Sequence, residues 1–417
     1  MLRSHPHPSV FMFLITPFGV LSGFLTVTVI SLLAQHGVTL EQSAVVGGAA
    51  MIPNVFKFVW APIVDTTLTQ KRWYMIGAVG TALGVLAMGA MPMNASSLTA
   101  LTWINFLGNV ASSVLGMATQ SLMAYDVPDD EKGRAGGWFQ AGNLGGGGIG
   151  GGLALFVAQR VHPDWLPGAG IAALCMLCAV ALRFVEEPRV QRTRDVLGNL
   201  ASVGRDLWHM ARARMGLVAL VLCILPIGSG AASNLWSNVA LEWKASQDTV
   251  ALWTGLIAGV VMMFGSLAGG WVCDHMNRKA AYAVYGVLQA MSAVAMGFLP
   301  HTERMFIVNT TIYAFATGLT YAGFTAFVLE AMGTGAAATK FSVFASLSNF
   351  PIWYMMLLDG HVGNIWHGSV MLYTEAAVGM LGLVVFLAFA AVVQSRWPAH
   401  WPQTVEDALA VAPAPID

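Results

Sequence analysis

The sequence predicts an all-α membrane protein with twelve transmembrane helices in two bundles of six. Three observations lead to this fold class: 56% of the 417 residues are hydrophobic, only 10% are charged, and the mean hydropathy is +0.66. Soluble domains average about 25% charged residues, so a water-soluble globule could not bury this much apolar surface. The same figures exclude disordered and collagen-like chains. A net charge of −1 gives no signature of nucleic-acid binding.

Twelve apolar stretches are long enough to be spans, because a membrane helix needs about 20 mainly apolar residues. We expect the first stretch to be retained, since it is too long for a signal peptide and no small-residue cleavage site follows it. The expected spans are roughly 9–34, 42–64, 73–92, 97–125, 135–159, 167–185, 213–238, 248–272, 279–299, 303–331, 338–359 and 369–394.

The basic residues determine the expected topology, because Lys and Arg accumulate on the cytoplasmic side of a membrane. With the N-terminus inside, 16 of the 20 Lys and Arg residues fall in inside segments, 3 fall in outside loops, and Lys57 lies within a span. Both termini are therefore expected to be cytoplasmic. The chain divides into a first bundle, a cytoplasmic amphipathic linker, a second bundle and a cytoplasmic tail, at residues 1–185, 186–212, 213–394 and 395–417.

The linker reads as an amphipathic helix. Apolar side chains recur in it at helical spacing, with arginines on the other turns, which is typical of a helix on the inner leaflet. These apolar residues are Leu197, Leu200, Val203 and Leu207.

An internal repeat relates the two halves. Asp65 and Asp274 follow spans 2 and 8 and are 209 residues apart. The segment RAGGWFQAGNL at 134–144 lies 206 residues before KFSVFASLSNF at 340–350. Parallel duplication of six spans is typical of secondary transporters.

On these motifs the chain resembles the major facilitator superfamily over essentially its whole length. Its G-x-x-x-D-x-x-x-R-K loop pattern is matched at 270–279, whereas the first-half copy has Ala61 in place of the glycine. The segments FKFVWAPIVD, ATQSLMAYDV and AATKFSVFASL further resemble the AmpG-type muropeptide permeases, a branch that includes acetyl-CoA transporters and siderophore permeases. Ser121 stands where the muropeptide permeases usually carry an acid.

The resemblance implies the major facilitator fold and a place in the bacterial inner membrane. It also implies proton-coupled import of an anhydro-muropeptide or another sizeable anionic, amide-rich solute, with a siderophore or an acyl-CoA-type compound as the alternative. No ATP-binding motif is present, so we expect no cofactor and a proton gradient as the driving force. We expect a monomer whose partners are lipid, protons and a small-molecule substrate.

Lys57 is the most informative single residue. It lies eight positions before Asp65, about 12 Å from the inner end of its span at 1.5 Å per residue. A charge at this depth costs a few kcal/mol, so it should face a cavity or a partner. We expect it to bind an anionic substrate group; a structural ion pair or a snorkelling side chain is the alternative. The other expected substrate-binding residues are Asn54, Trp60, Asn234 and Trp353.

Two carboxyl groups in the last two spans are candidates for proton coupling. Glu375 lies seven or eight residues into span 12 from its outer end, where it could also be a neutral acid that bonds two helices. Asp359 lies near His361 and His367 at the outer ends of spans 11 and 12. This cluster suggests an outer gate; no fourth ligand is visible, so we predict no metal, and such histidines are commonly solvated.

Charges at the cytoplasmic ends of the spans form a candidate inside gate, which in the resembled superfamily is held shut by such loop charges. The carboxylates can pair with cations or cap helix ends, and the alternative is that these charges only set the topology. The gate residues are Asp65, Arg72, Asp126, Arg134, Asp274, Arg278, Lys279, Glu330 and Lys340.

Span 5 contains ten glycines among the 17 residues from Gly136 to Gly152. A nucleotide-binding loop is excluded, because the run lies in an apolar span and no GK[ST] follows. Glycine allows helices to approach closely in lipid, and spans 5 and 8 meet in the resembled fold. The expected packing residues are Gly145, Gly148, Gly152, Gly255 and Gly259.

Three function classes fit a polytopic membrane protein. A secondary transporter with a central site open alternately to each side agrees with the repeat. A membrane-embedded acyl or glycosyl transferase would need a His/Asp or paired-acid constellation on one face, and none converges. A receptor derived from a facilitator would bind the same ligand without moving it. We expect a transporter and not an enzyme.

Overall fold

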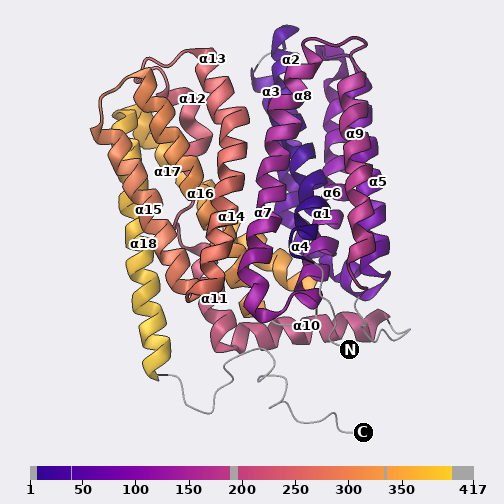
Figure 1. Cartoon of the computed structure of the whole chain (residues 1–417), viewed down its shortest axis with the longest axis vertical. Helices are drawn as coiled ribbons and strands as arrows, with labels where there is room; N and C mark the ends of the chain where they lie inside the picture. The colour runs from indigo at the N-terminus through magenta and orange to yellow at the C-terminus, as the bar shows by residue number, and fades with distance from the viewer. Residues whose placement is uncertain (1–6, 39, 188–195, 333–335, 397–417) are drawn as a thin grey trace.

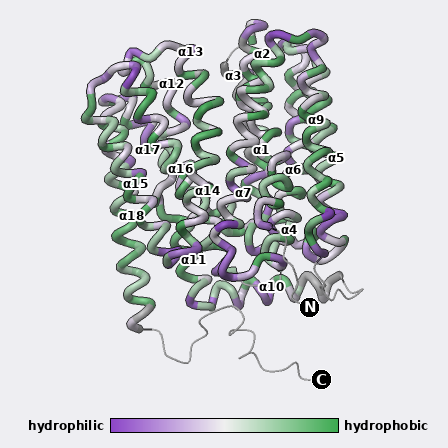
Figure 2. Tube along the Cα trace, in the orientation of Figure 1, coloured by the Kyte–Doolittle hydropathy of each residue, from purple (hydrophilic) through white to green (hydrophobic). Residues whose placement is uncertain are grey.

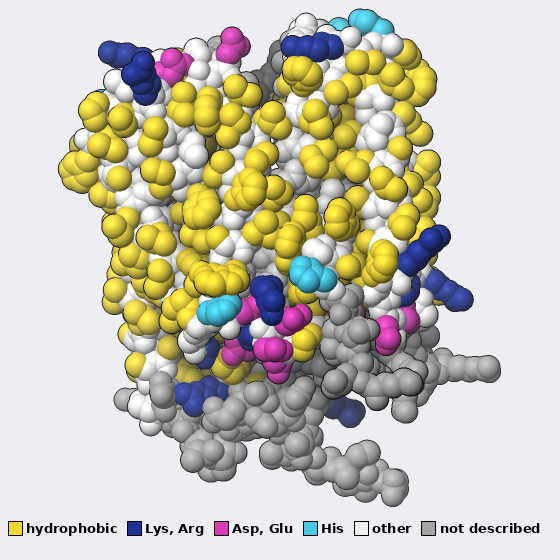
Figure 3. Space-filling model, viewed as in Figure 1, with side chains coloured by type: hydrophobic (Ala, Val, Ile, Leu, Met, Phe, Trp, Pro, Cys, Tyr) yellow, Lys and Arg dark blue, Asp and Glu magenta, His cyan; other side chains and the backbone are white. Residues whose placement is uncertain are grey.

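The computed structural model describes residues 7–38, 40–187, 196–332 and 336–396, and these ranges are built from helices (Figure 1). Eleven helical segments are long and apolar enough to cross a membrane, and a bent pair at 201–224 raises the number to twelve. Apolar side chains cover the flanks of the molecule, and charges gather at its two ends (Figures 2 and 3). The chain is therefore a multi-pass membrane protein, as predicted.

Helices of the first half carry six candidate spans, several of which are interrupted by tighter or wider turns. They are α1 (Val10–Gly23), η1 (Phe24–Val29), α2 (Ile30–Gln35), α3 (Leu40–Ala49), α4 (Met51–Thr66), α5 (Gln70–Ala90), η2 (Ala95–Ser97), α6 (Leu98–Asp126), η3 (Asp129–Glu131), α7 (Lys132–Gly148), η4 (Ile149–Leu153), α8 (Ala154–Ala158), α9 (Leu166–Cys178) and η5 (Ala179–Phe184).

The second half follows the linker helix α10 (Val196–Arg212). Its elements are α11 (Arg214–Ile224), η6 (Ala231–Leu235), α12 (Trp236–Val239), α13 (Gln247–Val250), η7 (Ala251–Ile257), α14 (Ala258–His275), α15 (Arg278–Phe298), α16 (Glu303–Met332), α17 (Ala337–Ile365) and α18 (Gly368–Arg396).

The seventh expected span, 213–238, is not one continuous helix. α11 ends before Pro226, which lacks the N–H that would continue the ladder, and Gly228 and Gly230 have left-handed φ values of 60° and 70°. Side chains from other helices satisfy the freed carbonyls: the Tyr354 hydroxyl donates to Ile224 O at 3.1 Å and the Tyr282 hydroxyl donates to Ile227 O at 2.9 Å. Broken backbone at membrane depth is stable where protein supplies such partners.

α10 lies across the ends of the helices at one end of the molecule, which we call the α10 end (Figure 1). It meets α11 at an angle of 84° and contacts α4 of the first half. Val203 and Met210 are buried, and Leu207 packs on the same core. Val203 and Leu207 therefore face protein, where a lipid-facing position was expected. The side chains of Leu197 and Leu200, together with residues 188–195 and 397–417, lie outside the described part.

The glycine-rich helix α7 packs between α1 and α14. A Cβ on Gly259 of α14 would lie 3.0 Å from Gly148 Cα, and one on Gly270 would lie 2.7 Å from Gly137 Cα. A Cβ on Gly142 would collide with the Met12 carbonyl of α1. Glycines on two faces of α7 thus bring it into backbone contact with its own half and with the other half.

Candidate functional site

Lys57 lies on α4 with 8% of its surface exposed. Within the described residues, its ammonium group has no hydrogen-bond acceptor and no carboxylate within ion-pair distance. An unpaired buried charge costs several kcal/mol. Binding of an anion to this ammonium group would therefore be favourable. Since Lys57 lies on a helix that contacts both α6 and α17, that partner would lie close to the junction of the two halves.

A ladder of amide groups flanks Lys57 on the α4–α6 interface. Asn54 Nδ2 donates to Asn109 Oδ1 at 3.3 Å, and Asn109 Nδ2 donates to Asn105 Oδ1 at 2.7 Å. One turn beyond Lys57, Trp60 Nε1 donates to the Ser113 hydroxyl at 3.2 Å. Asn54 and Trp60 therefore join two helices on either side of the lysine, and their amide and indole groups fix its surroundings.

Several buried polar atoms of α4 and α6 have no hydrogen-bond partner in the described structure. They are Asn54 Oδ1, Ser112 Oγ, Gln120 Oε1 and Ser121 Oγ. Buried polar groups are normally satisfied, so their number marks a region that can accept polar groups from outside the protein. Ser112 and Gln120 are functional candidates that the sequence did not indicate, because a hydroxyl or amide in an apolar span has no distinctive spacing. Ser121 was noted only as the residue that replaces an acid of the resembled permeases.

Glu375 of α18 is buried beside the broken seventh span. Its Oε1 accepts hydrogen bonds from the Tyr313 hydroxyl at 2.7 Å, Ala232 N at 3.3 Å and the Ser229 hydroxyl at 3.4 Å. A cavity of about 10 Å³, bordered by Ser229, Gln289 and the carboxyl group, adjoins it; this is close to the lower limit for one water molecule. Tyr313 was not predicted, since its 62-residue separation from Glu375 leaves no local pattern.

Asp359 of α17 is fully buried, and both of its carboxyl oxygens, like Glu375 Oε2, have no hydrogen-bond partner in the described structure. Asp359 on α17 and Glu375 on α18 belong to helices that pack against each other. His361 and His367 are exposed and do not join the pair. No group of three metal-ligating side chains forms among the described residues.

Asn234 and Trp353 are not brought to Lys57 by any recorded contact. Asn234 is exposed, and its side chain donates to Ala231 O at 3.2 Å next to the break. Trp353 is 53% exposed and packs on Phe350, with ring centroids 5.6 Å apart.

Asp65, at the end of α4, binds the first residues of α17 from the other half. Its carboxylate accepts hydrogen bonds from Ala338 N at 3.2 Å, Thr339 N at 2.8 Å and the Thr339 hydroxyl at 2.7 Å. An acid there satisfies amides that the helix leaves unpaired and complements the helix dipole. Asp65 therefore caps α17 across the junction.

Asp274 caps the N-terminus of α7 in the same way, at the equivalent position in the internal repeat. Its carboxylate accepts from Gly133 N at 2.7 Å, Arg134 N at 3.0 Å and Arg134 Nε at 2.9 Å. Because the two caps join α4 to α17 and α14 to α7, they hold the halves together at the α10 end. At the opposite end the halves part and leave a hollow (Figure 3).

Other expected gate residues reinforce this closed end. Arg278 donates to Glu330 Oε2 at 3.1 Å and to the carbonyl of Asp129 in the first half. The fully buried Lys340 donates to Met332 O at 3.0 Å, at the end of α16.

The remaining gate candidates are placed differently. Lys279 contacts Met215 Sδ at 3.0 Å within the second half. Asp126 ends α6 at this face. Arg72 is exposed on α5, and no recorded contact brings its side chain to the gate.

The packing glycines lie where α7 and η4 meet η7 and α14, with one exception. A Cβ on Gly145 would contact Met263 at 3.0 Å, and one on Gly152 would meet Leu256 at 2.5 Å. Gly148 and Gly259 face each other, whereas a Cβ on Gly255 would meet nothing within 4 Å.

A sequence profile described as Major Facilitator Superfamily matches residues 11–353. The anhydromuropeptide permease of Escherichia coli K12 is 23% identical over 359 residues, which cover 81% of this chain and 68% of the permease. An uncharacterized protein of Haemophilus influenzae is 24% identical over 380 residues, covering 83% of this chain and 84% of the other.

Solved structures share the fold. The proton:xylose symporter XylE has a TM-score of 0.68 at 14% identity, covering 97% of this chain and 98% of its own. The fucose:proton symporter of E. coli has a TM-score of 0.70 at 14% identity, with 92% and 98% covered. The human organic anion transporter MFSD10 has a TM-score of 0.68 at 15% identity, with 91% and 98% covered.

Proposed function

Because this chain belongs to the major facilitator superfamily, and is thus a secondary transporter and not an enzyme, we propose that it imports a sizeable anionic solute together with protons. The favoured substrate is an anhydro-muropeptide, for which the distant similarity to the E. coli permease is the support. A siderophore or an acyl-CoA-type compound is the alternative substrate. The bacterial relatives support a place in the inner membrane of a bacterial cell.

We place the α10 end in the cytoplasm, because 16 of the 20 basic residues belong to that side under this topology. The caps made by Asp65 and Asp274 then close the cytoplasmic side, and the hollow at the other end opens outward. This is the state of an importer that is ready to receive substrate. Alternating access requires these caps to break while the outer ends close.

Lys57 is the observation that carries the proposal. A buried ammonium group without a partner among the described residues suits a carboxylate or phosphate of the substrate, and the hydrogen bond would be charge-assisted. The neighbouring Asn54 and the unpaired acceptors of α6 suit the amide groups of a peptide or an N-acetyl sugar. An amide-rich anion matches both features at once.

The buried pair Asp359 and Glu375 is the proposed site of proton coupling. Two ionised carboxylates without cationic partners would be costly at this depth, so we infer that the pair holds at least one proton in this state. Tyr313 and the amide of Ala232 stabilise the ionised form of Glu375. Exchange of that proton with the inside would couple the proton gradient to the change of state.

The decisive experiment is uptake of labelled anhydro-muropeptide by proteoliposomes, with and without an inward proton gradient. We expect accumulation that depends on the gradient. No uptake by folded protein would reject muropeptide and redirect the test to siderophores and acyl-CoA compounds. Uptake without dependence on the gradient would reject the role of protons.

Lys57→Met tests the role of Lys57. Losing one charge-assisted contact costs about 1.5–3 kcal/mol, so we expect substrate to bind about 10-fold to 100-fold more weakly. The substrate-free melting temperature should not fall, because Lys57 has no partner to lose in the part of the chain that the structure describes. Lys244→Met, at an exposed loop lysine, is the matched control. A lower melting temperature with unchanged binding would instead assign Lys57 a structural role.

A further inference from the structure

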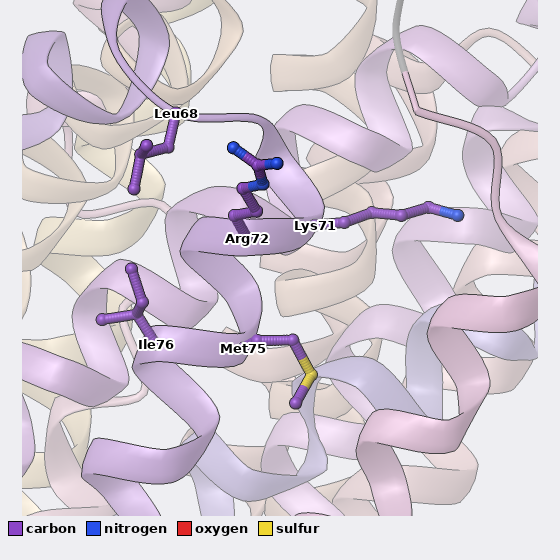
Figure 4. Close-up of a pocket in the computed structure, with 5 residues that line it drawn as sticks. All are labelled: Leu68, Lys71, Arg72, Met75 and Ile76. Carbon is purple, nitrogen blue, oxygen red and sulfur yellow. The ribbon is translucent and has the colours of Figure 1, made fainter.

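A pocket of about 430 Å³ lies on the outer flank of α5, near the α10 end. Leu68, Lys71, Arg72, Met75 and Ile76 line it (Figure 4). In Figure 4 the Arg72 side chain stands on the side of Leu68 and Ile76, where the first turn of a candidate span begins, whereas Lys71 extends to the other side of the helix. The gate and the proposed substrate site use neither cation.

The nearby acid Glu187 bonds to backbone amides and, among the residues that the structure describes, makes no ion pair with these side chains. Glu187 accepts hydrogen bonds from the backbone amides of Gln70 at 2.7 Å and Lys71 at 2.9 Å. In the described part of the chain, neither Lys71 Nζ nor the Arg72 guanidinium has a hydrogen-bond or ion-pair partner. The amide of Arg72 is also taken, by the Thr69 hydroxyl at 3.3 Å. An anion at this pocket would therefore meet side chains and not the helix N-terminus.

Below the cations, α5 presents an apolar face that suits acyl chains. Ile76 is 50% exposed, and Val79 and Leu83 continue the exposure along the same face at helical spacing. In Figure 4 the Arg72 guanidinium rises beside Leu68, whereas Ile76 and Met75 lie one turn further along the helix. A ligand with a charged head and an apolar tail matches this order, and a free anion would leave the apolar wall unused.

We propose that this pocket binds one anionic phospholipid, with its phosphate at Arg72 and an acyl chain along Ile76, Val79 and Leu83, while Lys71 contributes positive charge from the other side of the turn. The proposal rests on the membrane topology given with the proposed function, which puts the pocket at the headgroups of the inner leaflet. Arg holds a phosphate through two parallel hydrogen bonds, and Lys adds a second positive charge. The lipid would stabilise the turn between α4 and α5. Asp65, which caps α17, lies at the α4 end of this turn.

The test uses the full chain in phosphatidylcholine nanodiscs that contain a photoreactive phosphatidylglycerol. We expect crosslinks on α5 around Met75 and Ile76, and native mass spectrometry should show retained phosphatidylglycerol. Each basic residue near an anionic membrane surface contributes about a fivefold preference. Lys71→Gln and Arg72→Gln should therefore each lower retention about fivefold. Lys244→Gln, at an exposed lysine between α12 and α13 at the opposite end of the molecule (Figure 1), is the matched control and should change nothing.

Several outcomes would overturn the proposal. Equal crosslinking by photoreactive phosphatidylcholine would show ordinary lipid contact, and unchanged retention in the double variant would remove the cations from the site. Competition by glycerol phosphate alone, at equal strength, would make it a site for free anions. The charge-conserving pair Lys71→Arg and Arg72→Lys should keep retention if the variants fold. None of these readouts involves solute uptake, so failure here is distinguishable from failure of the transport proposal.

Discussion

The two aspartate caps should break together, so removing one cap should also increase the opening of the other. Asp65→Ala deletes the acceptor for Ala338 N, Thr339 N and the Thr339 hydroxyl. Loss of an N-cap costs about 0.5–2 kcal/mol, and hydrogen bonds to a charged group are worth about 1.5–3 kcal/mol. Water replaces part of these hydrogen bonds once the α10 end opens. We therefore expect Asp65→Ala to destabilise the closed state by about 2 kcal/mol, which is about 30-fold in the opening equilibrium.

Hydrogen exchange at Gly133 and Arg134 reads this equilibrium, because their amides are bonded to Asp274 and not to the mutated residue. If the halves separate as rigid bodies, exchange at both amides should accelerate about 30-fold in Asp65→Ala. Asp164→Ala removes an exposed acid from the far end of the bundle and is the control. Faster exchange in α17 with unchanged exchange at Gly133 and Arg134 would refute the reasoning, since the caps would then open separately.

Three further predictions concern other parts of the molecule. Glu375→Gln should keep exchange of substrate across the membrane while losing accumulation driven by a pH gradient, and unchanged accumulation would discard its coupling role. Gly259→Ala should destabilise the chain by about 1–3 kcal/mol through overpacking against Gly148, whereas Gly255→Ala should not; equal melting temperatures would contradict this. Burial raises the pKa of Asp206 on α10, so the folded chain holds that proton more tightly than the unfolded chain and stability falls as pH rises through the mildly acidic range. Asp206→Asn should flatten that slope of melting temperature against pH, and an unchanged slope would remove Asp206 as its cause.

Hydropathy and the repeat predicted the membrane fold well, because span length and duplication are properties of the linear chain. The break in the seventh span was less accessible: Pro226 predicts a kink, but the ending of α11 also depends on Gly228, Gly230 and the distant hydroxyl of Tyr354. Similarly, the glycines of α7 predicted close packing against α14, but not the equally close contact with Met12 of α1.

The inside gate was also only partly predictable from the sequence. The sequence identified Asp65 and Asp274 as gate acids and left open whether they pair with cations or cap helices. The structure places both at helix N-termini, and Asp274 also accepts a hydrogen bond from the Arg134 side chain. This choice depends on where α7 and α17 begin in space, which residue spacing does not encode. Arg72 has the same charge as Arg134 but faces away from the junction, so charge alone could not separate them.

The use of backbone amides as cap partners has an evolutionary consequence. Every residue except proline carries an amide, so the hydrogen bonds themselves require only that positions 133 and 338 are not proline. Packing limits both positions to small residues, because a Cβ on Gly133 would collide with Asp274 Oδ1 and Ala338 is fully buried. Among diverged homologues, the amide bonds of the two caps would therefore leave no co-varying charge at positions 133 and 338, and contact prediction from paired substitutions would detect these links poorly. The bond from the Arg134 side chain to Asp274 is the part of the gate that such substitutions could reveal.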